Sequence, residues 1–83
     1  MPRYAVWDNG GKTLDRYTVI ASRAVPERDG TLPCLGLSDM PTDAQGFSQW
    51  GTARRGPHLG QRVPFNSLPA HIRAHIAQRY AVG

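Results

Sequence analysis

Apolar and polar residues alternate over two short runs near the start of the chain, Arg3–Trp7 and Leu14–Ala21. Both runs are rich in aromatic and β-branched residues, which favour strands. Between them, Asn9 and Gly10 tolerate the positive φ that tight hairpin turns require. The pattern therefore predicts an antiparallel hairpin. We expect one face of this hairpin to carry the alternating apolar residues Tyr4, Val6, Tyr17, Val19 and Ala21.

A third extended segment is predicted at Leu32–Ser38, where Pro33 and Gly36 favour an edge position or a bulge. Residues 39–57 show no sustained pattern and are predicted to form a long loop, which in a small domain is often functional. A short helical turn or strand inside that loop stays open. The segment Leu59–Phe65 is predicted to be extended again and would supply a fourth strand.

The C-terminal segment has helical periodicity. Apolar residues recur there every four positions and form one stripe, to which Ala77 adds: Leu68, Ile72, Ile76 and Tyr80. Asn66 and Ser67 are suitable capping residues, and Pro69 suits the first helical turn. We therefore expect a helix from about Leu68 to Tyr80. The predicted fold class is α+β, with a small antiparallel sheet of three or four strands and this helix packed on one face.

The length of 83 residues leaves room for one small domain, which we expect to span residues 1–83 around a thin core. The single cysteine, Cys34, excludes an internal disulfide and any zinc site built from cysteine pairs. A secreted domain of this size usually needs such cross-links. No run approaches the ~18 apolar residues of a membrane span, and no signal peptide is visible. We therefore expect a cytoplasmic protein without a membrane partner.

Charge is unevenly distributed between the two halves of the chain. Residues 1–43 hold five basic and six acidic residues, whereas residues 44–83 hold five arginines, all three histidines and no acid. Such asymmetry is typical of proteins with an acidic or polyanionic partner. A general preference for arginine over lysine would produce the same charge without any ligand. Nucleic-acid binding by the arginine-rich C-terminal half is therefore one of the functional hypotheses.

The segment from residue 46 to residue 62 combines aromatic, amide and basic side chains within the predicted loop region. Trp and Arg dominate the energetics of protein interfaces, and aromatics interleaved with Arg also stack on unpaired bases. We therefore predict a binding surface for a host or partner protein, with nucleic acid as the alternative ligand. Its six candidate residues are Gln49, Trp50, Arg54, Arg55, His58 and Arg62. Phe47 and Trp50 would instead be core residues if they fold back beneath the loop.

Catalytic chemistry has little support in the sequence. His71 and His75 lie four residues apart on the predicted helix, and with His58 they would form an open three-histidine zinc site. The glutamate between the two helical histidines that marks a metalloprotease helix is missing. Cys34 lies between apolar neighbours and is expected to be a buried, inert thiol. We predict no enzymatic activity and no metal or other cofactor, and a histidine-based metal enzyme is the second alternative.

Several short strings along the chain, from Tyr4 to Ile76, resemble a group of small bacterial and phage-borne proteins of unknown function. They are Asp8-Asn-Gly-Gly11, Asp15-Arg-Tyr-Thr-Val19, Leu37-Ser38, Gly46-Phe-Ser-Gln-Trp50, His58-Leu-Gly60 and Leu68-Pro69. The resemblance implies a compact accessory protein and brings no catalytic residues with it.

A homodimer is also an expected state, because the thin core and the predicted edge strand at Leu32–Ser38 both favour a partner.

Overall fold

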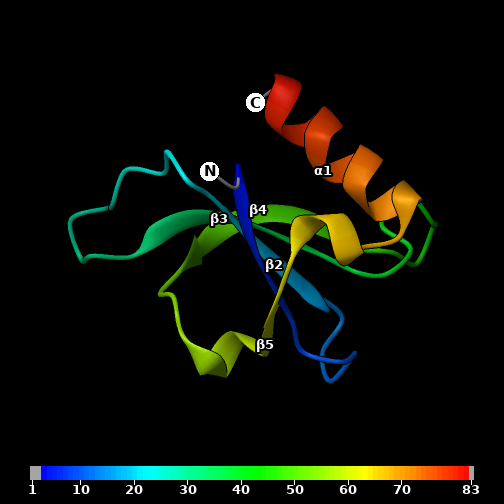
Figure 1. The fold of residues 1–83 in the computed structure, drawn as a ribbon, viewed down its shortest axis with the longest axis horizontal. Helices are drawn as coiled ribbons and strands as arrows, with labels where there is room; N and C mark the ends of the chain where they lie inside the picture. Colours follow the sequence, from blue (N-terminus) through cyan, green and yellow to red (C-terminus); the bar gives the residue numbers. More distant parts are fainter. Residues whose placement is uncertain (1–2, 83) are drawn as a thin grey trace.

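The computed structural model describes residues 3–82, which form one antiparallel sheet, two short 3-10 turns and a C-terminal helix (Figure 1). The strands are β1 (Tyr4–Asp8), β2 (Tyr17–Ala21), β3 (Leu32–Leu37), β4 (Ser48–Ala53) and β5 (Gln61–Val63). The 3-10 turns η1 (Pro57–Leu59) and η2 (Phe65–Ser67) flank β5, and the helix α1 spans Ala70–Val82. The α+β class with a C-terminal helix is confirmed.

The sheet has the strand order β4-β3-β2-β1-β5, and every neighbouring pair is antiparallel. The first four strands form a meander, and β5 returns to pair with the free side of β1. The predicted hairpin is confirmed, because Val6 lies opposite Val19 and Tyr4 lies opposite Ala21. β1 runs from Tyr4 to Asp8, so the two ends of the sheet are called here the Tyr4 end and the Asp8 end.

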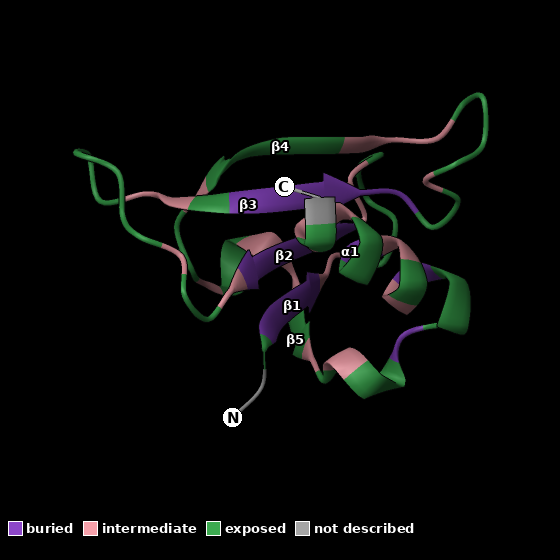
Figure 2. Cartoon of the chain, turned by 90° about the horizontal axis from the view of Figure 1, so that it is seen from above, coloured by how far each residue is buried: buried purple, intermediate pink, exposed green. Residues whose placement is uncertain are grey.

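The main core lies between α1 and one face of the sheet. The predicted helical stripe supplies Leu68, Ile72 and Ile76, all buried, while Tyr80 packs against the same cluster and Ala77 is exposed. Each fully buried aliphatic side chain of this kind contributes about 1.5–3 kcal/mol to folding. The strands supply the other buried members of this cluster, which are Tyr4, Val6, Tyr17, Val19, Leu35 and Leu37. In Figure 2, the three central strands are buried and α1 lies over them.

The other face of the sheet carries a second, smaller apolar cluster of Ala5, Trp7, Ile20 and Cys34. Two connections cover it. Ala24 from the β2–β3 connection and Leu59 from η1 both pack against this cluster. Residues 54–60 therefore run diagonally across this face, from the Tyr4 end of β4 to the Asp8 end of β5. This second cluster adds buried apolar area to a chain too short for a thick single core.

Two sequence predictions about the strands were wrong. The sheet has five strands, because β4 lies inside the segment that was predicted to be a loop. The segment Leu32–Leu37 is a central strand, since it pairs with both β2 and β4. Pro33 is tolerated there because the pairing with β2 extends only to Leu35, and beyond it β3 pairs with β4 alone.

The bounds of two other elements also differ from the predictions. The hairpin connection is longer than a tight two-residue turn, because β2 begins only at Tyr17 and residues 9–16 form a loop. The helix begins at Ala70, two residues after the expected start, because Leu68 has an extended backbone and closes η2. Leu68 nevertheless joins the core with the helical stripe.

Candidate binding surfaces

The six residues predicted to form one binding surface lie on both faces of the sheet. Trp50 lies opposite Leu35 on the α1 side, whereas the neighbouring Gln49 lies opposite Gly36 and faces the other way. Arg54, Arg55 and His58 follow β4 on the diagonal connection, and Arg62 lies on β5 at the opposite edge of the sheet. The structure therefore does not bring all six side chains together.

Trp50 is the exposed member of a small aromatic and cationic group on the α1 side. Its side chain is 45% exposed, so the alternative that it is a core residue does not hold. The Trp50 ring meets the Tyr80 ring edge-on at a centroid distance of 5.0 Å. The Arg79 guanidinium lies over the Trp50 ring, 5.2 Å from its centroid. A ring held between an aromatic edge and a cation is rigid and amphipathic, as interface anchors often are.

The basic candidates on the other face have different local partners. Arg54 donates a hydrogen bond from Nη2 to the carbonyl oxygen of Asp29, which joins the diagonal connection to the β2–β3 connection. The Arg62 guanidinium lies 5.1 Å from the centroid of the buried Trp7 ring. Arg55 and His58 are exposed. Arg54 and Arg62 thus have structural roles on this face.

The three histidines do not converge on one point. His75 Nε2 and Ser48 Oγ are hydrogen-bonded at 2.7 Å, which ties α1 to β4. His71 Nε2 is hydrogen-bonded to the carbonyl oxygen of Asp39 at 2.8 Å, and His58 lies on η1 across the sheet. Within residues 3–82, no group of three or more His, Cys, Asp or Glu side chains is placed to share a metal ion.

Burial explains the shifted pKa values of two candidate groups. Desolvation lowers the pKa of His75, and the nearby Arg79 charge lowers it further. Burial raises the pKa of the Cys34 thiol, and the Asp15 charge acts in the same direction. A protonated, buried thiol is a poor nucleophile. The prediction that Cys34 is buried is confirmed.

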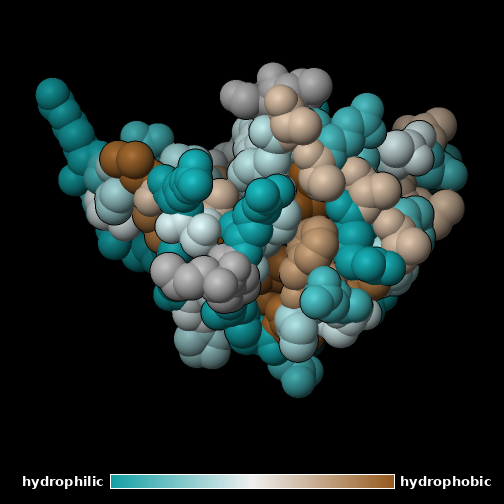
Figure 3. Space-filling view, turned by 45° about the horizontal axis from the view of Figure 1, so that its top comes forward, coloured by the Kyte–Doolittle hydropathy of each residue, from teal (hydrophilic) through white to brown (hydrophobic). Residues whose placement is uncertain are grey.

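Arginines line two adjoining clefts at the Tyr4 end, beside the C-terminal half of α1. The clefts have volumes of about 670 and 730 Å³, and they share Arg3, Tyr4 and Ala77. Arg23 lines the second cleft, and Arg62, whose guanidinium lies over Trp7, contributes to the lining of the first; none of the described residues that line either cleft is acidic. The hollow near the middle of Figure 3 has hydrophobic surface at its base and hydrophilic side chains around it. We call this pair of clefts the arginine cleft.

Aromatic rings run in a row from the arginine cleft to Trp50. Neighbouring ring centroids are 5.1 Å apart for Phe65 and Tyr4, and 5.0 Å apart for Tyr4 and Tyr80. The Tyr80–Trp50 pair continues the row. The Tyr80 hydroxyl donates a hydrogen bond to the carbonyl oxygen of Val19, and burial raises the Tyr80 pKa to about 12. The floor of the cleft is therefore aromatic, while its rim is cationic.

The sequence pattern missed most of this cleft. Arg3, Arg23 and Tyr80 come from three distant parts of the chain and share no local motif. Only Arg62 was among the predicted site residues. The lack of acids in residues 44–83 was the one useful indication, because the clefts draw Arg62, Phe65 and Tyr80 from that half.

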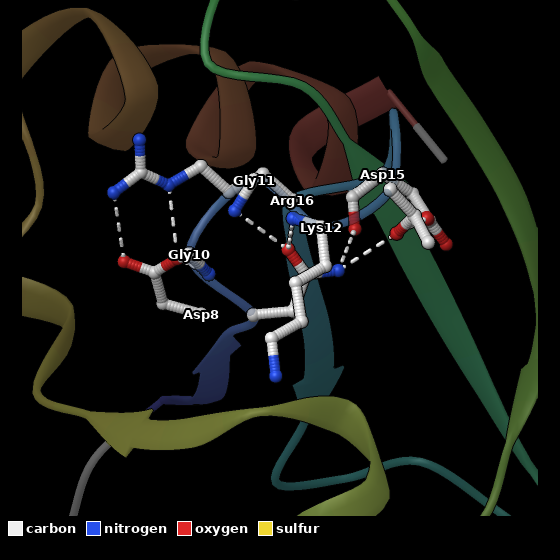
Figure 4. Close-up of polar contacts among 8 residues, drawn as sticks. Asp8, Gly10, Gly11, Lys12, Asp15 and Arg16 are labelled. Atoms are coloured by element: carbon white, nitrogen blue, oxygen red, sulfur yellow. Dashed lines mark hydrogen bonds and ion pairs between the residues drawn. The ribbon is translucent and has the colours of Figure 1, made fainter.

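The β1–β2 loop is organised by its own side chains (Figure 4). Arg16 donates two hydrogen bonds to the Asp8 carboxylate, from Nε at 2.9 Å and from Nη2 at 3.2 Å. This contact lowers the pKa of Asp8. The Asn9 side chain accepts hydrogen bonds from the backbone N–H groups of Gly11 and Lys12. Side chains at the start of this loop thus accept hydrogen bonds from several of its own backbone N–H groups.

No protein-family model matches this chain, and no curated protein or solved structure matches it either. The resemblance to small bacterial and phage-borne proteins therefore stays a prediction. Among residues 3–82, no helix is both long and apolar enough to span a membrane.

Proposed function

We propose that this chain is a non-catalytic binding protein whose ligand is a single-stranded nucleic acid held in the arginine cleft. The observation that carries the proposal is a cleft that Arg3 and Arg23 line with guanidinium groups that have no ion-pair partner among the described residues, and whose described lining holds no acid. Arginine guanidinium groups bind phosphates with two hydrogen bonds at once, and Arg3 and Arg23 are available for such contacts. Of the two ligand classes expected from the sequence, nucleic acid is the one that this rim supports.

The aromatic floor supports single strands over duplexes. Phe65 and Tyr80 are partly exposed beside the rim, and unpaired bases stack on such rings. Each cleft has a volume within the range that accommodates small organic ligands. A duplex would present its phosphates but would keep its bases away from the floor.

The non-catalytic part of the proposal rests on where the reactive side chains lie. Ser48 and His75 form the one contact here that resembles a nucleophile and its base, and neither residue lines the arginine cleft. The described residues also offer no carboxylate hydrogen-bonded to His75 as an orienting group. A cytoplasmic location, expected from the single cysteine, is part of the same proposal.

The test is fluorescence anisotropy with a labelled 12-nucleotide single strand and a matching duplex, titrated at several salt concentrations. We expect tighter binding to the single strand, with a log–log salt slope of about −1.4 if Arg3 and Arg23 neutralise two phosphates. Replacing Arg3 and Arg23 by alanine should weaken binding at least about tenfold and flatten the slope. These two side chains have no ion-pair partner among the described residues, so the fold should tolerate the change.

Lys12→Ala is the matched control, because Lys12 is an exposed cation in the loop at the Asp8 end. We expect this control to leave both affinity and slope nearly unchanged. Equal losses from Lys12→Ala and from the arginine pair would show general charge attraction and would contradict the proposal. Binding of an acidic peptide with no binding of the oligonucleotide would assign the cleft to a protein partner instead.

A further inference from the structure

The outer side of β4 presents unpaired backbone groups. Within residues 3–82, β4 pairs only with β3, and the N–H of Ser38 donates to the carbonyl oxygen of Phe47 at the start of this pairing. Backbone groups of successive residues alternate in direction along an antiparallel pair. Since the backbone groups of Phe47 point toward β3, the backbone groups of Gln49 and Gly51 point toward β3 as well. The N–H and C=O groups of Ser48, Trp50 and Thr52 therefore point outward, away from the sheet.

This outer edge has none of the features that usually prevent strand addition. β4 is six residues long, contains neither charged residues nor proline, and is largely exposed. Figure 2 shows β4 along the outer margin of the molecule, with no helix or strand beyond it. Protein edges are normally protected by a charge, a proline, a bulge or a covering segment. An uncharged and uncovered edge is suited to pairing with another strand.

The charges that flank β4 identify the partner. The connection before the strand carries Asp39 and Asp43 and no basic residue. The segment directly after the strand carries Arg54 and Arg55 and no acidic residue. If two such segments align antiparallel, the acidic connection of each lies toward the arginine pair of the other. The segment is thus complementary to itself, and this favours a second copy of the chain over an unrelated strand.

We infer that two copies of this chain associate through antiparallel pairing of their β4 strands. The twofold axis lies at Trp50. Trp50 therefore pairs with Trp50 of the second copy, and Ser48 of each copy pairs with Thr52 of the other. This register uses all the outward backbone groups of β4. A register centred on Gly51 would leave Ser48 outside the ladder. Shifting by a single residue would place side chains of opposite sheet faces together, so it is excluded.

The exposed Trp50 fits this arrangement. The twofold axis brings the two Trp50 rings together on the α1 side of the extended sheet, each already supported by Tyr80 and Arg79. Burial of the ring would remove apolar surface from water at the centre of the interface, where binding energy is concentrated. The inference does not depend on the nucleic-acid proposal, because Trp50 and Thr52 do not line the arginine cleft.

The first test is sedimentation velocity over a range of protein concentrations. The wild type should convert from monomer to dimer as its concentration rises. Thr52→Pro removes an outward N–H and no hydrogen bond to β3, so it should raise the dimer dissociation constant at least about tenfold. Thr52→Ser keeps that N–H and is the matched control, which should dimerise like the wild type. A wild type that stays monomeric at high concentration would overturn the inference.

A second test remains informative if Thr52→Pro fails to fold. Arg55→Glu cancels the positive charge of the flank that follows β4, because Arg54 and the new glutamate balance each other, and Asp43→Lys likewise cancels the negative charge of the preceding flank. Each variant alone should dimerise more weakly than the wild type, because each charged flank then faces a flank without net charge. An equimolar mixture of the two should form a heterodimer, since the acidic flank of one variant then faces the arginine pair of the other and the substituted lysine faces the substituted glutamate. A mixture no more associated than its components would contradict the antiparallel register.

Discussion

The two edge strands of the sheet differ in ways that matter for association. β5 has three residues, its Arg62 side chain lies over Trp7, and Pro64 follows it directly. β4 has twice as many residues and neither charge nor proline. Charge, proline and short length are the usual protections of a sheet edge. The β5 edge is therefore protected, whereas the β4 edge is open to pairing with another strand.

The two edges should differ most in how much stability the fold loses when a glycine at each edge is replaced by alanine. Gly60 precedes β5 with φ at +116°, and a Cβ there would lie 2.4 Å from the Asp8 carbonyl oxygen. Gly60→Ala should therefore destabilise the fold by about 2–4 kcal/mol, because backbone must move to admit the methyl group. Gly51 lies in β4, where a Cβ would meet nothing within 4 Å.

Gly51→Ala is the matched variant, and we expect it to change stability by no more than about 0.5 kcal/mol. Chemical denaturation monitored by circular dichroism measures both variants. Equal destabilisation by the two substitutions would mean that the backbone at the start of β5 is no more constrained than the exposed edge.

A smaller difference is expected between the two Arg–Trp pairs, one at each edge. Arg62 covers the buried Trp7 beside β5, and Arg79 lies over the exposed Trp50 on β4. Arg62→Ala should cost about 1 kcal/mol and should shift tryptophan emission to longer wavelength as Trp7 becomes hydrated. Arg79→Ala should cost less than about 0.5 kcal/mol, because its partner ring is already in water. The opposite order of stabilities would contradict this assignment.

The smallest effect concerns pH and the contact between α1 and the β4 edge. The pKa of His75 is lowered in the folded state, so the unfolded chain binds this proton more readily. The contribution of His75 to the free energy of unfolding is therefore complete above the pKa of the unfolded state, about 6.5. It is lost as the pH falls from that value toward the lower pKa of the folded state. His75→Gln should flatten this part of the stability profile, measured by denaturation between pH 8 and pH 5. An unchanged profile would show that His75 does not cause the loss of stability between pH 8 and pH 5.

The sequence predicted the parts of the fold that follow from local pattern. The alternation in Tyr4–Val6 and Tyr17–Ala21 and the four-residue spacing from Leu68 to Tyr80 gave the hairpin, the helix and the face they share. β4 could not be predicted in this way, because its residues are mostly exposed on both faces and its partner β3 supplies the ladder.

The candidate site was less predictable than the fold. Alternation along β4 turns Gln49 and Trp50 to opposite faces, which closeness in sequence conceals. The arginine cleft depends on the return of β5 to β1, which brings Tyr4 and Phe65 together although they are far apart in the chain. Its aromatic floor likewise combines Tyr4 with Tyr80. Contacts of this range follow from topology, and no local motif encodes them.

Amide hydrogen exchange at low and high protein concentration tests the central contrast between the two edges most directly. We predict that the amides of Trp50 and Thr52 exchange rapidly in dilute protein and become protected as concentration rises. The amides of β5 should exchange at the same rate at both concentrations. Rapid exchange of the outward β4 amides at every concentration, or equal protection of β5, would contradict the account.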